Sequence, residues 1–165
     1  MKLFIAYSAY YLLDVSLVTH ELGHMIVLHI TSLIIYHTLA SPISIELNFT
    51  AQNGHTYSDT YQKLIDNKHW TALRINAAAG LGAELLVILI LIVLASYKLN
   101  CALALALYLL KRRCEHFFKT EDRQTIKQPE TWVYKPSTYT GKSISLGLFK
   151  IAITNDQCYW EYLKK

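Results

Sequence analysis

The sequence predicts a mainly α membrane protein: a bundle of about three transmembrane helices with a β-hairpin insertion and a small, β-rich C-terminal appendage. Hydrophobic residues make up 53% of the 165 residues and charged residues 17%, against about 25% charged residues in ordinary soluble domains. Three apolar stretches, at residues 3–40, 75–96 and 100–118, have the composition of membrane helices. Between the first two, alternating apolar and polar residues predict a hairpin over 43–60.

Length and charge limit the domain organisation and the partners. We expect one membrane-embedded core at residues 1–128 and a polar appendage at 129–165. The net charge is only +4, and the basic cluster 111–113 directly follows an apolar stretch, where membrane proteins keep such residues. No basic stripe of the kind that binds nucleic acid is present, and the three cysteines lack a C-x-x-C spacing. The sequence therefore predicts a multi-pass protein of a bacterial inner or cell membrane, with the lipid bilayer as a partner and no nucleic acid.

The first apolar stretch, residues 3–40, contains no proline and a single glycine, Gly23. At about 1.5 Å per residue, such a helix is too long for one straight crossing of a roughly 30 Å hydrocarbon core. We expect it to tilt, to project beyond the bilayer or to break. Strands are then predicted near 43–50 and 55–60, because apolar residues alternate there and the pair Asn53-Gly54 is typical of a hairpin turn.

The remaining elements follow from composition. Residues 61–74 are polar and amphipathic, which is typical of the membrane interface. Residues 75–96 are long enough to span a bilayer and carry one charge, Glu84, whereas 100–118 form a shorter apolar helix that ends in basic residues. From Thr120 the chain is polar, with alternating stretches that predict a few strands.

One motif stands out inside the first apolar stretch: His20-Glu21-Leu22-Gly23-His24 fits H-E-x-x-H. On a helix, two histidines at i and i+4 lie on one face and can bind a single Zn²⁺ ion through their ring nitrogens. The glutamate beside them can accept the proton of a metal-activated water. The sequence therefore predicts His20 and His24 as metal ligands and Glu21 as the catalytic base.

The helical wheel around the motif supports this interpretation. At about 100° per residue, five polar groups share one third of the circumference. They are Asp14, His20, Glu21, His24 and Thr31. Polar residues within a membrane are costly and normally face a bundle interior or a wet cavity. His29 and His37 fall elsewhere on the wheel, so we interpret them as packing or interfacial residues.

The stretch "VTHELGHMIVLH", followed by a strand-rich insertion and by "AAAGLGAELL" at 77–86, resembles the site-2 protease type of membrane zinc metallopeptidase, including its small bacterial relatives. The resemblance covers roughly residues 12–125, and H-E-x-x-H is its specific part. It implies a third metal ligand, an aspartate on or just after the third helix, often in an Asp-Gly pair. This chain has no Asp-Gly pair. Asp122, in "FFKTEDRQTI", is the nearest positional match.

Two other carboxylates are alternatives for the third ligand. Glu84 lies inside the second predicted span, where a carboxylate is costly and therefore a functional candidate. Asp156, in the C-terminal region, is more remote along the chain.

The expected function is that of a membrane-embedded zinc metalloprotease that hydrolyses peptide bonds of membrane-spanning or membrane-proximal polypeptides. The alternative is a non-catalytic metal-binding or regulatory membrane protein that retains the H-E-x-x-H helix, which the missing Asp-Gly pair favours. A third alternative is a soluble metallopeptidase whose apolar helices form a core.

Overall fold

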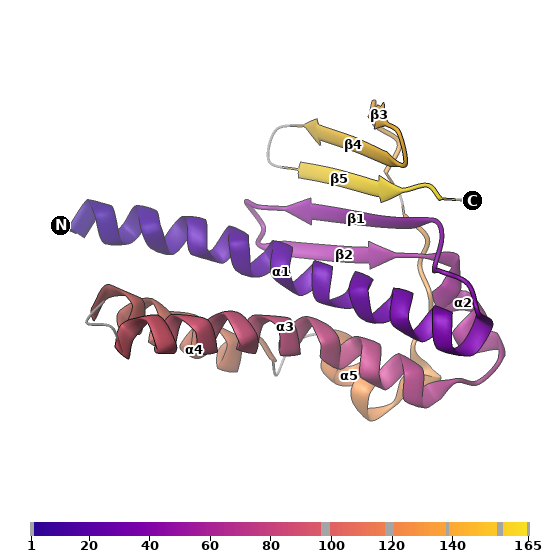
Figure 1. The fold of residues 1–165 in the computed structure, drawn as a ribbon, viewed down its shortest axis with the longest axis horizontal. Coiled ribbons are helices and arrows are strands. Elements are labelled where there is room, and N and C mark those ends of the chain that lie inside the picture. The colour runs from indigo at the N-terminus through magenta and orange to yellow at the C-terminus, as the bar shows by residue number, and fades with distance from the viewer. Residues whose placement is uncertain (1, 97–99, 118–120, 138, 155–156, 165) are drawn as a thin grey trace.

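The computed structural model describes residues 2–96, 100–117, 121–137, 139–154 and 157–164. Five α-helices, one short 3₁₀ helix and five strands occur in these ranges (Figure 1). In chain order they are α1 (Lys2–Tyr36), β1 (Ile43–Asn48), β2 (Asn53–Tyr57), α2 (Asp59–Asp66), α3 (Trp70–Ser96), α4 (Asn100–Phe117), α5 (Glu121–Lys127), η1 (Pro129–Thr131), β3 (Ile144–Leu146), β4 (Phe149–Thr154) and β5 (Gln157–Tyr162).

The first helix, α1, is continuous over 35 residues. It ends at Tyr36, four residues before the end of the predicted stretch, because His37 adopts a positive φ of 56°. The backbone N–H of His37 donates to the Leu33 carbonyl at 3.1 Å, which closes the last turn. The helix therefore does not break into two pieces.

The other two predicted membrane helices are present with different extents. Helix α3 begins at Trp70, five residues earlier than the predicted start at 75. Among the described residues, two stretches are long and apolar enough to cross a membrane: Asp14–Tyr36 and Trp70–Ser96. In α4 the apolar part, Ala102–Lys111, is shorter than such a stretch, and the predicted end at 118 lies outside the described residues.

The predicted hairpin is confirmed, but its turn lies elsewhere. Strands β1 and β2 pair antiparallel, with Asn48 opposite Asn53 and Leu47 opposite Gly54. The Asn53-Gly54 pair therefore belongs to β2, and residues 49–52 form the turn. The Asn48 side chain stabilises this turn, because its Oδ1 accepts a hydrogen bond from the Ala51 N–H at 2.8 Å.

The C-terminal region is β-rich, as predicted, but its strands do not form a sheet of their own. Strand β5 pairs antiparallel with β1, from Ile43 opposite Tyr162 to Asn48 opposite Gln157. The result is one five-stranded sheet in the order β2-β1-β5-β4-β3. The predicted division at residue 128 did not anticipate this pairing of the hairpin with the end of the chain.

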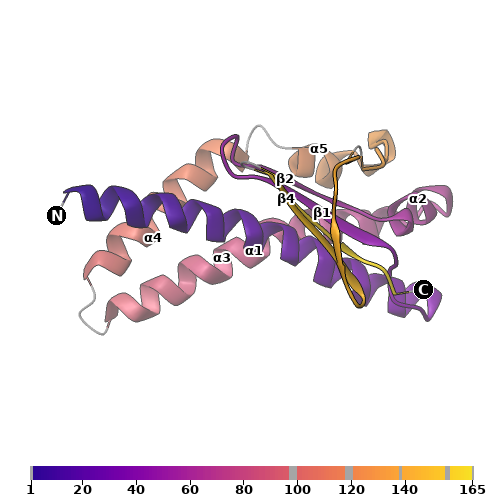
Figure 2. The same ribbon diagram turned by 90° about the horizontal axis from the view of Figure 1, so that it is seen from above.

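The elements are arranged in layers. The sheet lies on one side of α1 and helix α3 on the other (Figure 1), and both views show the N-terminal half of α1 extending beyond the sheet (Figures 1 and 2). Small clusters of buried apolar side chains join these layers. They comprise Leu28, Ala40, Ile43, Tyr61, Leu64 and Leu73 between α1, α2 and α3; Leu17, Ile45 and Leu47 between α1 and the sheet; and Ile88, Ala106 and Leu109 between α3 and α4.

Candidate metal centre

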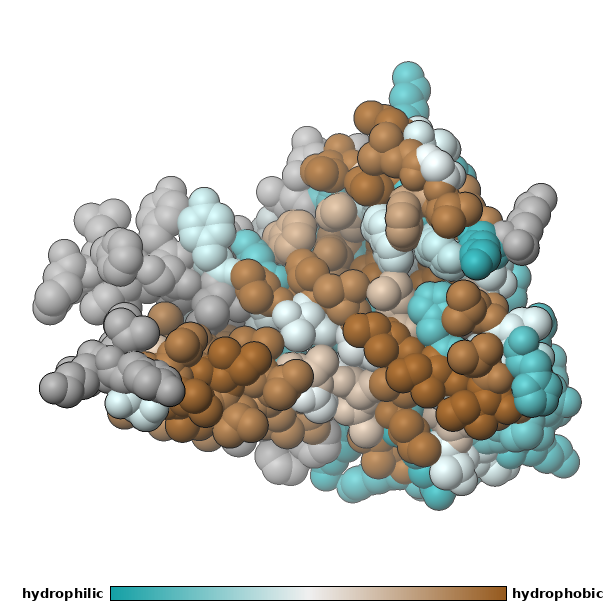
Figure 3. Space-filling view, viewed as in Figure 1, coloured by the Kyte–Doolittle hydropathy of each residue, from teal (hydrophilic) through white to brown (hydrophobic). Residues whose placement is uncertain are grey.

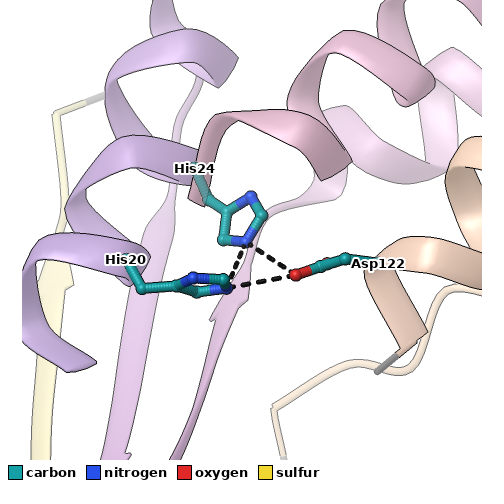
Figure 4. A group of neighbouring side chains, drawn as sticks. All are labelled: His20, His24 and Asp122. Carbon is teal, nitrogen blue, oxygen red and sulfur yellow. Dashed lines mark hydrogen bonds and ion pairs between the residues drawn. The ribbon is translucent and has the colours of Figure 1, made fainter. Parts of the chain in front are cut away.

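Three predicted ligand residues meet at one point between α1 and α5. His20 and His24 lie one turn apart on α1, and Asp122 approaches them from α5 (Figure 4). The two Nε2 atoms are 3.0 Å apart. The Oδ2 atom of Asp122 lies 3.1 Å from Nε2 of His20 and 3.6 Å from Nε2 of His24. The structure thus brings the two histidines together with an aspartate that lies 102 residues after His20 in the sequence.

The spacing of these three atoms fits a tetrahedral zinc ion. Zinc bonds to imidazole nitrogens and carboxylate oxygens are about 2.0–2.1 Å long, so neighbouring ligands of a tetrahedral site lie about 3.3–3.4 Å apart. The observed separations of 3.0, 3.1 and 3.6 Å differ from this by only a few tenths of an ångström. Two imidazoles and one carboxylate also leave a fourth position free, as in catalytic zinc sites.

The orientation of His24 is fixed by its other ring nitrogen. Nδ1 lies 2.8 Å from the backbone carbonyl oxygen of Asn76 on α3. Because a carbonyl only accepts, Nδ1 carries the proton and donates it, which leaves the lone pair of Nε2 available for a metal. Metal-bound histidines commonly make this second hydrogen bond.

Asn76 contributes more than its carbonyl, although the sequence reasoning did not identify it. Its side-chain Nδ2 donates to the His24 carbonyl at 2.9 Å, and its Oδ1 accepts a hydrogen bond from the Tyr61 hydroxyl. Burial raises the pKa of Tyr61 well above its ordinary value, so the hydroxyl stays a donor. Asn76 is only 2% exposed. An amide within an apolar stretch is costly, and this cost is the signal that could have identified it.

Gly80 is the second residue that the sequence reasoning missed. A Cβ atom at this position would lie 2.5 Å from Nε2 of His20 and 2.6 Å from Nε2 of His24. Only a residue without a side chain therefore allows both imidazoles to lie against α3. Gly23, inside the motif, has a related role, because its Cβ would lie 2.7 Å from the Ala79 carbonyl oxygen where α1 meets α3.

Glu21 points toward the sheet and lines the same cavity as the three candidate ligands. This cavity has a volume of about 330 Å³, and residues 51–56 of the hairpin form one of its walls. Glu21 is 3% exposed, and its Oε2 accepts a hydrogen bond from the Thr56 hydroxyl at 2.7 Å. A Cβ at Gly54 would lie 2.9 Å from the Glu21 carboxylate, so the hairpin packs tightly against this group.

Asp122 is held as a carboxylate. Burial acts to raise the pKa of this group, but the contacts with the His20 and His24 rings outweigh burial and hold the pKa well below its ordinary value. In the metal-free protein Asp122 is therefore a carboxylate that accepts a hydrogen bond from Nε2 of His20, and a metal bound here would displace that proton.

Glu84, the first alternative for the third ligand, lies on the other side of the His20 ring. Its Oε1 is 3.5 Å from Nδ1 of His20, not beside the Nε2 atoms, and it accepts a hydrogen bond from the Ser16 hydroxyl at 3.0 Å. The second alternative, Asp156, is outside the described residues. Among the residues that the structure describes, Asp122 is thus the carboxylate that lies against both imidazoles.

Three other polar residues of the first apolar stretch, Asp14, His29 and His37, lie outside the group of ligand atoms. His29 stacks edge-on against Tyr162 with ring centroids 5.7 Å apart, and His37 is exposed. Asp14 accepts a hydrogen bond from the Gln52 side chain at 2.8 Å. These positions agree with the interpretation of His29 and His37 as packing or interfacial residues.

Comparisons of the chain with models of known protein families, with curated proteins and with solved structures gave no match.

Proposed function

We propose that this protein is a membrane-embedded zinc metalloprotease, similar to the site-2 protease type, that hydrolyses peptide bonds of membrane-spanning or membrane-proximal polypeptides. One observation carries the proposal: Nε2 of His20, Nε2 of His24 and Oδ2 of Asp122 converge at tetrahedral spacing, and Glu21 lines the same cavity. An ordinary buried histidine pair needs neither a converging carboxylate nor a second acid beside it. The full set has the composition of a hydrolytic zinc site.

The residues around the cavity have distinct roles in this proposal. A zinc ion held by His20, His24 and Asp122 would supply Lewis-acid chemistry and lower the pKa of water from 15.7 to about 7. Glu21 accepts the proton of the attacking water and passes it to the nitrogen of the leaving amine. Thr56 binds Oε2 of Glu21, which fixes the carboxylate and leaves Oε1 as the proton acceptor.

The surface supports a membrane location for this chemistry. Large apolar side chains are exposed along α1 and α3, and Figure 3 shows hydrophobic residues along the face that these helices present. Both stretches that could cross a membrane carry site residues: Asp14–Tyr36 carries His20, and Trp70–Ser96 carries Asn76. Multi-pass insertion would therefore bring the cavity close to polypeptides within or beside the bilayer.

The substrate would bind in an extended form along β2. This strand is an edge of the sheet, and residues 53–56 of it line the cavity beside Glu21. A helical substrate hides its carbonyl groups in hydrogen bonds, whereas strand addition presents them. In a cleaved model peptide, N-methylation of alternate backbone amides beside the cleaved bond should strongly reduce cleavage. Equal cleavage of the methylated peptide would exclude binding by strand addition.

The decisive experiment compares wild-type protein with Glu21→Gln and with Glu46→Gln. Glu46 lies on β1 and does not line the cavity, so it serves as the control. Each purified protein is assayed for zinc content and for cleavage of synthetic transmembrane peptides in proteoliposomes. All three should bind one zinc ion per chain, and only Glu21→Gln should lose cleavage, by several orders of magnitude.

Other outcomes contradict the proposal in different ways. Wild-type protein without zinc would exclude the metal centre. Equal cleavage by Glu21→Gln and wild-type protein would exclude Glu21 as the base. Zinc binding without cleavage by the wild-type protein would favour a non-catalytic metal-binding protein.

A further inference from the structure

The imidazoles of His20 and His24 differ in the hydrogen-bond partner of Nδ1, the ring nitrogen that does not face Asp122. Nδ1 of His24 donates to a backbone carbonyl on α3 at 2.8 Å. Nδ1 of His20 is buried and makes no hydrogen bond within normal geometry. The nearest acidic oxygen is Oε1 of Glu84, at 3.5 Å, a few tenths of an ångström beyond a normal bond.

Glu84 is an unusual residue for this location. It lies in the middle of α3, where charged side chains are costly, and its side chain is only 1% exposed. It does not reach the Nε2 atoms that face Asp122, because it lies on the opposite edge of the His20 ring. A role as a direct ligand therefore does not account for its position.

A second residue of α1 holds the Glu84 carboxylate. The Ser16 hydroxyl donates to Oε1 of Glu84 at 3.0 Å, and Ser16 is itself buried. Ser16 and His20 are one turn apart on α1, so both contact the same oxygen from one helix face. The carboxylate is thus oriented toward the outer nitrogen of the His20 ring.

We propose that Glu84, oriented by Ser16, is a positioning residue that accepts the Nδ1 proton of His20 and so presents Nε2 of His20 to the metal. The inference rests on the proposed zinc site. Hydrogen bonds around catalytic groups are often long without the bound partner and tighten when it binds. Carboxylates in this outer position fix the histidine tautomer and raise its basicity, and their loss typically costs about 10- to 100-fold in metal affinity.

The test measures zinc affinity by competition with a chelator, using full-length protein in detergent. The variants are Glu84→Leu, Glu84→Gln, Ser16→Ala and Asp122→Ala. We expect Glu84→Leu to weaken zinc binding about 10- to 100-fold. Glu84→Gln keeps an oxygen acceptor and should restore much of that loss, whereas Ser16→Ala should cause a smaller loss than Glu84→Leu. Asp122→Ala removes a ligand and should weaken zinc binding most.

A spectroscopic measurement separates this role from simple packing. In the zinc-loaded wild-type protein, the Nδ1 proton of His20 should give a downfield, slowly exchanging NMR signal. The signal should persist in Glu84→Gln and disappear in Glu84→Leu. If Glu84→Leu fails to fold, the comparison of Glu84→Gln and Ser16→Ala with wild-type protein by the same two measurements still tests the inference.

The possible failures can be told apart. Wild-type protein that binds no zinc would overturn the metal centre and this inference together. Tight zinc binding by wild-type protein that is unchanged in Glu84→Leu would overturn only the positioning role. Loss of zinc in Glu84→Leu together with retention in Asp122→Ala would make Glu84 a direct ligand and would also overturn the inference.

Discussion

At the residue scale, the packing of α3 against the two imidazoles of the candidate site depends on Gly80, which carries a hydrogen atom where other residues carry a Cβ. Gly80 lies against both imidazoles, and any side chain there would occupy the space of their Nε2 atoms. For Gly82, two positions further along the same helix, no atom of another described part of the chain lies within 4 Å of the place where its Cβ would be. The two glycines therefore form a matched pair for testing whether zinc binding depends on the absence of a side chain next to the His20 and His24 rings.

Gly80→Ala is expected to weaken zinc binding at least about tenfold, which corresponds to about 1.4 kcal/mol, because its methyl group displaces the ligand nitrogens. Gly82→Ala should bind zinc as the wild-type protein does. Its thermal stability should stay equal or rise, because alanine is favoured over glycine in a helix by about 0.5–1 kcal/mol. Chelator competition and thermal unfolding in detergent measure both effects. Equal zinc affinity in the two variants would contradict the close packing described for Gly80.

At this scale the sequence predicts only what local geometry fixes. The i, i+4 spacing of His20 and His24 fixes their common face on any helix, and both rings do share one face. The position of Asp122 came from resemblance to a family. Asn76 could have been noticed as a costly amide in an apolar stretch, but its partners, like the role of Gly80, depend on where α3 meets α1, and no local pattern in the sequence records that meeting point.

At the scale of elements, the interface between α1 and α3 contains hydrogen bonds as well as apolar contacts. Asn76 contacts the ring and the backbone of His24 and also binds Tyr61 of α2. One amide therefore links three helices next to the site. Such a network restrains α1, which carries two of the candidate ligands, relative to α2 and α3.

Asn76→Leu keeps the approximate shape of the side chain and removes its hydrogen bonds to the His24 carbonyl and the Tyr61 hydroxyl, whereas the backbone carbonyl of residue 76 can still accept from the His24 ring. We expect a loss of about 1–3 kcal/mol of stability for each buried polar group left without a partner, together with weaker zinc binding because the backbone of His24 loses its hydrogen bond to α3. Arg74→Ala, at an exposed position of the same helix, should change stability by less than about 0.5 kcal/mol. Denaturation in mixed micelles and chelator competition provide the measurements. Unchanged stability of Asn76→Leu would show that the network contributes little.

Elements with local patterns were predicted better than those that depend on distant partners. The hairpin follows from alternation within a short stretch, and only its turn was misplaced, because the Asn48 side chain stabilises a turn ahead of the Asn53-Gly54 pair. The pairing of β1 with β5 joins two segments that lie far apart in the sequence, residues 43–48 and 157–162. Alternation predicts that a strand exists, but it does not identify its neighbour.

At the scale of the whole molecule, the distribution of apolar surface predicts how the protein behaves in a membrane. The second half of α3 exposes several large apolar side chains, among them Leu86, Leu89, Ile90 and Val93. A soluble protein rarely exposes so continuous an apolar surface. These apolar side chains are suited to contact with lipid acyl chains.

After expression in cells, the protein should remain in the membrane pellet on alkaline carbonate extraction. The double variant Leu89→Asp/Val93→Asp should be recovered largely in the soluble or aggregated fraction, because an aspartate at the centre of a membrane helix costs about 2.5–3.5 kcal/mol for insertion. Leu89→Ala/Val93→Ala serves as the control and should stay in the pellet. Release of the wild-type protein by carbonate would favour a soluble metallopeptidase whose apolar helices form a core.

The pairing of β1 with β5 also has a consequence for biosynthesis. Residues 43–48 leave the ribosome long before residues 157–162, so one side of β1 has no partner while most of the chain is still being made. Asp122 emerges within this interval, and the three candidate ligands can therefore meet before the sheet is complete. During that time the unpaired side of β1 is free to form a strand pair with any extended segment nearby. Strand β5 must displace such a segment before the five-stranded sheet can form.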